Sequence, residues 1–371
     1  MSWDSIVGQQ RVKGMLRRMI ESGRLPHALL FHGPAGSGKD AMAIELARVL
    51  NCERGGDAAC GECPSCEMMD SLRHPNLRLV FPLPARDDES SPLDKFTPEE
   101  MEEVNAQIDE KAANPYHRIL IPKASGIKVS SIREIRRDAS FRAQGKGRLV
   151  VIISEAERMN PNAANALLKT LEEPGGDMLL VLTTSQRDAL LPTIRSRCQL
   201  IRFDPLRPED IRVALMRRHG IEEGIAEAAA RMASGSFGDA LDMALAGQVV
   251  TREEVLEYIR AVVRNNPMQL HGIIQQAIGK DDRQAAIRFL VAVGSWFRDV
   301  LLLHEGASEG LMNEDLRDAL TRFAEHYPHV HCGEALEEID NAIEMIQKNL
   351  HLVNLMIVLS QRLRRCIVTH Q

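Results

Sequence analysis

The sequence predicts an α/β core built on a parallel sheet, followed by two helical domains. The length of 371 residues suggests two or three domains. Up to residue 205, short apolar runs alternate with helical patterns, as in a parallel sheet covered by helices on both faces. Beyond that point the periodicity is almost entirely helical. We place the core domain at 1–205, a small helical domain at 206–248 and a larger helical domain at 249–371.

Four apolar runs are expected to form the strands of the sheet. They lie at residues 28–32, 149–154, 178–184 and 198–203. The first run ends at a glycine-rich loop, and apolar residues recur at helical spacing after that loop. This order of strand, loop and helix is the context in which a phosphate-binding loop occurs.

The segment GPAGSGKD, residues 33–40, is almost a phosphate-binding loop. The motif requires Gly, four residues, Gly, Lys and then Ser or Thr, but position 40 is Asp. The residues that could still hold phosphates on backbone N–H groups and a cation are Gly33, Gly36, Gly38 and Lys39. Asp40 either binds Mg²⁺ directly or stabilises the first turn of its helix, and the sequence does not separate the two roles.

A second departure follows the strand expected at 149–154. In phosphate-loop ATPases a metal-binding Asp and a catalytic Glu end this strand, whereas the chain has Ser154 followed by Glu155. The changes at 40 and 154 remove both groups that usually hold Mg²⁺. Because the metal contributes several kcal/mol and about 1.4 kcal/mol is tenfold in rate, we expect hydrolysis to be slowed by orders of magnitude.

Four of the seven cysteines lie within one short module, residues 51–68. Cys52, Cys60, Cys63 and Cys66 have the spacing C-x7-C-x2-C-x2-C, which is typical of a structural zinc site. Four thiolates leave no open position on the ion, so a catalytic metal is not expected. The module would serve as a local staple or, alternatively, as a docking surface.

Residues 83–125 are expected to form an acidic insertion outside the compact core. Between 87 and 111, ten acidic residues are accompanied only by Lys95 and Lys111. We predict a solvated segment with one amphipathic helix over 98–112. A partner-binding acidic surface is the alternative.

Charge and hydropathy restrict the location and the partners. No apolar run is long enough for a membrane span, and the N-terminus shows no basic-then-apolar signal, so a cytoplasmic protein without membrane partners is expected. The net charge of −6 argues against strong nucleic-acid binding by the isolated chain. The basic stretch 128–148 either contacts DNA phosphates or presents a solvated helix face.

Several motifs resemble those of bacterial clamp-loader subunits of the AAA+ superfamily. The segment SEAERMNPNAANALLKTLEEP, residues 154–174, is a highly specific match, and GQQ (8–10), HALLFHGPAGSGK (27–39) and TIRSRCQLIRF (193–203) accompany it. The resemblance covers most of residues 1–205. It implies an AAA+ phosphate-loop core with a zinc-binding insertion, a small helical lid domain and an all-α collar domain.

The resemblance also implies which branch of the family is closest. Polar sensor residues are expected at Thr183 and Thr184, and Gly238 stands where motors of this superfamily carry a nucleotide-contacting Arg. With Asp40 and Ser154, this third departure favours the delta prime branch of the DNA polymerase III clamp loader over the alternative, an active gamma/tau-like ATPase. A small-metabolite phosphotransferase accounts for fewer of the motifs. Binding of ATP or ADP is expected to be weak or absent, and the chain to lack ATPase activity of its own.

Arg197 is the catalytic residue that the resemblance implies. The motif Ser196-Arg197-Cys198 resembles an arginine finger, which enters the nucleotide site of a neighbouring subunit and offsets charge on the γ-phosphate. A salt-bridged surface Arg is the alternative reading from the residues alone. The implied partners are the gamma/tau and delta subunits, the sliding clamp indirectly, and primed DNA, all within the DNA polymerase III holoenzyme, a DNA-directed DNA polymerase.

Overall fold

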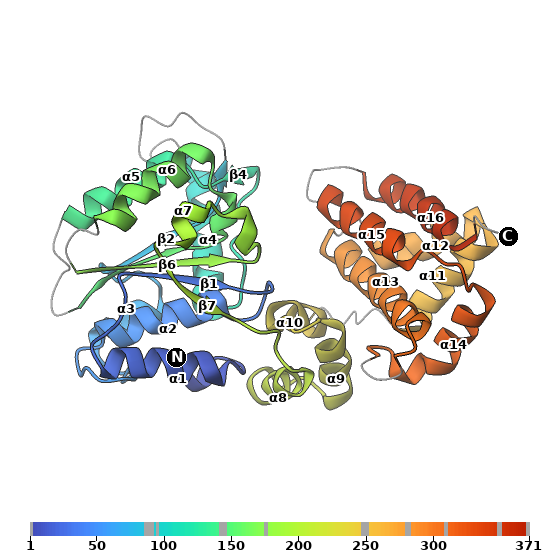
Figure 1. Cartoon of the computed structure of the whole chain (residues 1–371), viewed down its shortest axis with the longest axis horizontal. Helices are drawn as coiled ribbons and strands as arrows, with labels where there is room; N and C mark the ends of the chain where they lie inside the picture. The colour runs from blue at the N-terminus through green and yellow to red at the C-terminus, as the bar shows by residue number, and fades with distance from the viewer. Residues whose placement is uncertain are drawn as a thin grey trace. The chain divides into compact units, whose positions relative to one another are not determined.

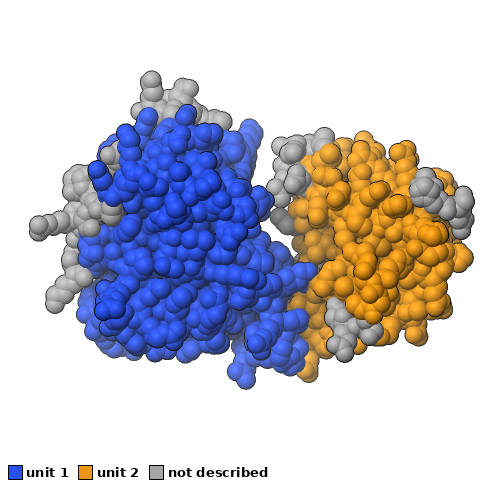
Figure 2. All heavy atoms as spheres, in the orientation of Figure 1, with its two compact units in different colours: residues 1–220, 233–241 blue, residues 221–232, 242–371 orange. Residues whose placement is uncertain are grey.

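The computed structural model describes residues 3–84, 93, 96–140, 147–173, 177–245, 252–278, 283–307, 311–346 and 351–368. The chain divides into two compact units, which Figure 2 colours separately: residues 1–220 with 233–241, and residues 221–232 with 242–371. The domain boundaries at 205 and 248 stay predictions. None of the helices in the described ranges combines the length and the apolar character that crossing a membrane requires.

The first unit is built on a five-stranded parallel sheet in the order β2-β5-β6-β1-β7 (Figure 1). Its strands are β1 (Ala28–His32), β2 (Leu77–Val80), β5 (Leu149–Ile153), β6 (Met178–Thr184) and β7 (Gln199–Arg202). Four of them confirm the predicted strands and with them the parallel α/β core. Sequence analysis missed β2, because the exposed Arg78 interrupts its short apolar run.

Helices cover both faces of this sheet (Figure 1). One face carries α1 (Gln10–Glu21), α2 (Lys39–Asn51) and α3 (Pro64–Asp70), and the other carries α5 (Val129–Ser140), α6 (Pro161–Glu172) and α7 (Pro192–Arg195). Successive residues of a strand point to opposite faces. Leu29 and Phe31 of β1 therefore join the first core, while Ala28 and Leu30 join the second.

The insertion after β2 is partly packed, contrary to the prediction of a solvated segment. Its ends pair as a short antiparallel sheet of β3 (Leu83–Pro84) and β4 (Ala124–Gly126). The predicted helix is confirmed as α4 (Pro98–Ala113), which begins with a capping box formed by Thr97 and Glu100. Val104 and Lys111 of α4 are buried. The acidic residues at 87–89 and 94 lie outside the described residues.

The rest of the chain is helical where it is described, as predicted. Three helices follow β7: α8 (Pro208–His219), α9 (Glu223–Met232) and α10 (Phe237–Leu245). The second unit continues with α11 (Arg252–Arg264), α12 (Pro267–Ile278), α13 (Arg283–His304), α14 (Arg317–His326), α15 (Cys332–Ile346) and α16 (Leu352–Val368). The buried carboxylate of Asp299 in α13 accepts hydrogen bonds from the N–H groups of Met312 and Asn313. These bonds fix the segment before α14.

Candidate nucleotide site, cysteine cluster and surface arginine

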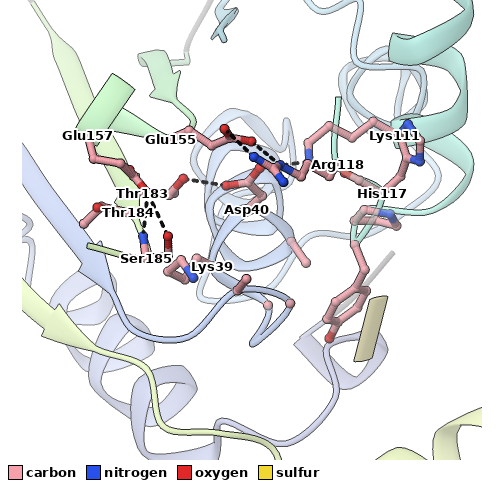
Figure 3. Close-up of a pocket in the computed structure, with 16 residues that line it drawn as sticks. Lys39, Asp40, Lys111, His117, Arg118, Glu155, Glu157, Thr183, Thr184 and Ser185 are labelled. Atoms are coloured by element: carbon pink, nitrogen blue, oxygen red, sulfur yellow. Dashed lines mark hydrogen bonds and ion pairs between the residues drawn. The ribbon is translucent and has the colours of Figure 1, made fainter. Parts of the chain in front are cut away.

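The glycine-rich loop lies at the carboxyl end of β1, between β1 and α2. Ligand sites of parallel α/β sheets form at this edge. A cavity of about 170 Å³ opens there (Figure 3). The predicted site residues that line it are Gly36, Gly38, Lys39, Asp40, Glu155, Thr183 and Thr184, whereas Gly33 and Ser154 do not line it. The fold therefore brings together residues that the motifs had suggested separately.

Gly36 places the loop directly against the segment before α10. Its φ of 66° is left-handed, and a Cβ there would lie 1.7 Å from Ser236 Oγ. The N–H of Phe237 donates to the carbonyl of Gly36 at 3.1 Å. Only glycine fits this close approach without strain.

The Lys39 ammonium bonds to its own loop. Nζ donates to the carbonyl oxygens of Gly33 at 2.8 Å and Pro34 at 2.5 Å. Burial lowers the pKa of Lys39 to about 8. The cation that would neutralise a phosphate is thus engaged with backbone carbonyls.

The Asp40 carboxylate lies in the first turn of α2 and is held by three side chains from other elements. It accepts hydrogen bonds from Thr183 Oγ1 at 2.7 Å and Lys111 Nζ at 2.9 Å (Figure 3). A third hydrogen bond comes from Ser154 Oγ at 3.0 Å. Burial opposes ionisation, but the Lys111 charge and these hydrogen bonds outweigh it and lower the pKa of Asp40. Asp40 is therefore an ionised group with a full set of protein partners.

Asp40 and Ser154, the two departures from the usual motif, contact each other directly. The usual motif has a hydroxyl at the start of the helix and a carboxylate at the end of the strand. Here the carboxylate comes from α2 and the hydroxyl follows β5, and the two still hydrogen-bond. Lys111, whose side chain is 2% exposed, adds an ammonium group at the same carboxylate.

Glu155 is held by a guanidinium. Nε and Nη2 of Arg118 donate to its two oxygens at 2.5 and 2.8 Å, and Arg158 Nη1 lies 3.4 Å away. Burial raises the pKa of Glu155, but the Arg118 and Arg158 interactions outweigh it, so the net pKa is lowered. A carboxylate with this pairing is a poor base for activating water.

Tyr116 packs over the loop from the segment that follows α4. A Cβ on Gly38 would lie 3.3 Å from its ring, and the ring packs at a tilt of 60° against Phe237, with centroids 4.6 Å apart. Its hydroxyl accepts the N–H of Val7 at 2.7 Å. Gly238 lies beside it, since a Cβ there would be 3.3 Å from the Tyr116 carbonyl oxygen. The position that lacks the expected Arg is thus closed by Tyr116.

The cavity beside the loop is small. Ligand pockets usually span about 300–1,000 Å³, well above the volume of this cavity. Lys111, Tyr116 and Arg118 were not identified from sequence. The one available signal was Lys111, the single basic residue of the acidic helix α4.

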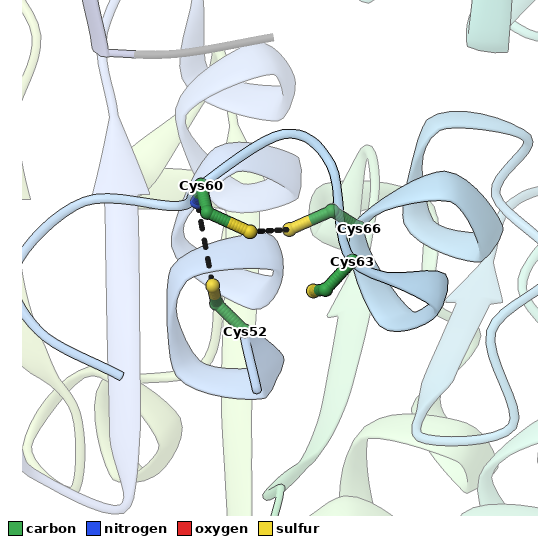
Figure 4. Close-up of side chains that lie close together, drawn as sticks. All are labelled: Cys52, Cys60, Cys63 and Cys66. Carbon is green, nitrogen blue, oxygen red and sulfur yellow. Dashed lines mark hydrogen bonds between the residues drawn. The ribbon is translucent and has the colours of Figure 1, made fainter. Parts of the chain in front are cut away.

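The four predicted cysteines meet in the module after α2 (Figure 4). Their sulfur atoms all lie within 4.8 Å of one another, and the Sγ atoms of Cys60 and Cys66 are 3.9 Å apart. Zn²⁺ binds thiolates at about 2.3 Å, which places tetrahedral sulfur atoms about 3.8 Å apart. The donor set and its spacing therefore fit one metal ion.

The module is tied to the N-terminal segment. Trp3 Nε1 donates to the carbonyl of Asp57 at 2.6 Å, and Arg17 Nη2 lies 2.5 Å from the Asp57 carboxylate. Ser65, between two of the cysteines, donates to the carbonyl of Asn51 at 2.6 Å. The cysteine module thus connects α1, α2 and the first residues of the chain.

Arg197 lies at the surface after α7, with a side chain that is 36% exposed. Its Nη2 donates to Glu172 Oε1 at 2.7 Å and its Nη1 to the carbonyl of Thr193 at 3.1 Å. It does not line the cavity of its own loop. A role in catalysis would have to be exerted on another molecule.

Only some of the basic side chains in the stretch 128–148 are exposed. Arg133 and Arg137 of α5 are exposed, whereas Lys128 is buried. Residues 141–146 lie outside the described residues.

Two family profiles match the chain. The profile described as DNA polymerase III, delta subunit, matches residues 8–207, more than half of the chain. The profile described as DNA polymerase III, delta subunit, C terminal, matches residues 249–367. The matches coincide with the α/β core and with the larger helical region.

Individual relatives carry corresponding names. DNA polymerase III subunit delta′ of Bacillus subtilis is 28% identical over 332 residues, covering 85% of this chain and 84% of the relative. The subunit delta′ of Escherichia coli is 28% identical over 308 residues, covering 82% and 78%. Subunit gamma/tau of Mycobacterium tuberculosis is 30% identical over 354 residues, covering 87% of this chain and 54% of the relative. This chain therefore belongs to the DNA polymerase III delta prime family of clamp-loader subunits.

Proposed function

We propose that this chain is a largely non-hydrolysing subunit of the DNA polymerase III clamp loader, which braces the assembly and supplies a trans-acting arginine finger. Its partners would be the gamma/tau and delta subunits, and through them the sliding clamp and primed DNA, in the cytoplasm. The observation that supports the first part is the pairing of the Asp40 carboxylate. It already accepts hydrogen bonds from Ser154, Thr183 and Lys111, so a metal would compete with these three groups for its oxygens.

The hydrogen bonds that Lys39 and Glu155 make to other protein groups support the same proposal. Hydrolysis needs a cation at the terminal phosphate and a carboxylate free to orient water. Here Lys39 bonds to loop carbonyls and Glu155 to Arg118. Each group would have to leave its present partners before it could act.

Phosphate release by the purified chain tests this point. We expect negligible turnover with or without primed DNA, and titration calorimetry with ATP or ADP, with and without Mg²⁺, to show weak or no binding. Turnover that Lys39→Ala abolishes would instead establish the rival function, an active gamma/tau-like motor.

The exposed guanidinium of Arg197 supports the finger. An Arg stays charged and planar, and a trans-acting Arg accelerates phosphoryl transfer by about 10³–10⁵-fold. Arg197→Ala should leave assembly intact and depress the ATPase of the reconstituted loader at the site that this Arg serves. Arg73→Ala is a matched control, because Arg73 is also exposed and also lies 2.7 Å from a carboxylate, that of Asp109. An unchanged ATPase in Arg197→Ala would refute the finger.

We further propose that the cysteine cluster holds a structural Zn²⁺. Cys52, Cys60, Cys63 and Cys66 would bind it as thiolates, and the ion would contribute folding free energy to the module. Any contact of α5 with DNA would be to phosphates through Arg133 and Arg137.

A further inference from the structure

We propose that Glu172 is a positioning residue for Arg197: it holds the guanidinium in the orientation that meets the terminal phosphate in a neighbouring subunit. This inference rests on the proposed arginine finger. Glu172 is the last residue of α6, and its Oε1 accepts from Arg197 Nη2 at 2.7 Å. No role follows for Glu172 from the phosphate-loop motif or from the finger motif itself.

The backbone of Arg197 is held in place by a hydrogen bond and by its buried neighbours. Its N–H donates to the carbonyl of Ile194 at 3.1 Å, and both Ile194 and the next residue, Cys198, are buried in the core on that face of the sheet. What remains free is the long side chain, and Arg loses much rotamer freedom when it is ordered. A contact that restricts this side chain prepares it for catalysis before the partner arrives.

Two acceptors define where the guanidinium lies. Glu172 Oε1 binds one terminal nitrogen and the Thr193 carbonyl binds the other. A guanidinium has five N–H donors, so these two bonds leave about three for another acceptor. The group is therefore oriented without being saturated, and an incoming phosphate, with more negative charge than one carboxylate, can bind the remaining donors.

Glu172 itself does not act on the phosphate, because its negative charge would repel the nucleotide. It acts through the terminal nitrogen of Arg197 that it binds. Both side chains are partly exposed, at 36% for Arg197 and 50% for Glu172. Solvent screens such pairs, so the expected effect is modest, about two- to fivefold in rate.

The test uses the full chain in a loader reconstituted with its ATPase subunits. Glu172→Ala is expected to lower kcat for ATP about two- to fivefold with KM unchanged, because orientation of the finger matters in the transition state. Glu172→Gln keeps an amide oxygen as acceptor and should restore part of the rate. Glu173→Ala is the matched control, since Glu173 is the exposed neighbour and Arg197 donates to Glu172 instead. Assembly and thermal stability should be the same in all variants.

The Arg197→Ala background separates the possible outcomes. If Glu172 acts through Arg197, Glu172→Ala causes no further loss of rate there. An equal loss in both backgrounds, or a wild-type or increased rate in Glu172→Ala, would overturn the positioning role while leaving the finger intact. An unchanged rate in Arg197→Ala alone would instead remove the finger, and with it the basis of this inference.

Discussion

Replacing Lys111 by Met would remove the ammonium group that lies 2.9 Å from Asp40 Oδ2 while keeping an unbranched side chain of similar length. Removing one partner of a buried ion pair costs about 3–5 kcal/mol, because the other charge is left uncompensated. The Asp40 side chain is 24% exposed and keeps its bonds to Ser154 and Thr183, so we expect a smaller loss, about 2–3 kcal/mol.

The pH dependence adds a second signature. The pKa of Asp40 is lowered in the folded chain, so its stabilising contribution is full above the unfolded pKa and is lost as pH falls through the folded pKa. Without Lys111 the pKa of Asp40 should rise. The destabilisation of Lys111→Met should therefore be largest at pH 7 to 8 and shrink toward about pH 4.

Urea unfolding measured by Trp3 fluorescence is the assay. The chain has 2 tryptophans, and a Trp296→Phe background leaves Trp3 as the reporter of the first unit. The double variant Lys111→Met, Asp40→Asn should recover most of the loss, and the exposed helical Lys169→Met should have little effect. A loss below about 0.5 kcal/mol in Lys111→Met, or strictly additive effects in the double variant, would refute the coupling between Lys111 and Asp40.

Two further predictions concern the same unit. Glu45 of α2 is fully buried with neither carboxylate oxygen hydrogen-bonded to the described residues, and Arg48 Nη1 lies 3.7 Å away. Burial raises the pKa of Glu45 to about 7, although the Arg48 charge acts in the opposite direction. Above pH 7 the folded chain holds an ionised, buried carboxylate, which destabilises it, whereas at pH 4 this carboxyl group is protonated. Glu45→Gln should therefore raise the free energy of unfolding by about 1–3 kcal/mol at pH 8 and not at pH 4. Denaturation at both pH values checks this. Chelation of the proposed Zn²⁺ should loosen the contact of Trp3 with Asp57 and shift Trp3 emission to longer wavelength in the Trp296→Phe background. Cys60→Ser should cause the same shift without chelator, and an unshifted spectrum after removal of the bound metal would contradict the connection.

Local patterns predicted the scaffold well. Apolar runs identified four of the five strands, and only β2, with Arg78 inside it, escaped. The glycine-rich loop and the cysteine module were recognisable because each is contiguous in sequence. The helix α4 was predicted too, but its packing was not, since its acidic composition indicated a solvated segment although Val104 and Lys111 are buried.

The contacts between the side chains around Asp40 could not be predicted from local sequence patterns. Lys111 lies 71 residues from Asp40 in sequence, and Thr183 lies 143 residues from it. Only the fold brings such residues together, and no periodicity relates them. Sequence analysis identified the departures at 40 and 154 but treated them as separate losses, whereas the structure joins them in one hydrogen bond.

The exchanged pair of Asp40 and Ser154 also restricts how this lineage can change. Restoring a hydroxyl at position 40 alone would leave the buried Lys111 without its carboxylate, and restoring Asp at position 154 alone would set a second carboxylate beside the first. Each single step would leave an uncompensated charge and is expected to be destabilising. If the metal site is lost as proposed, reversion one substitution at a time would therefore pass through less stable chains.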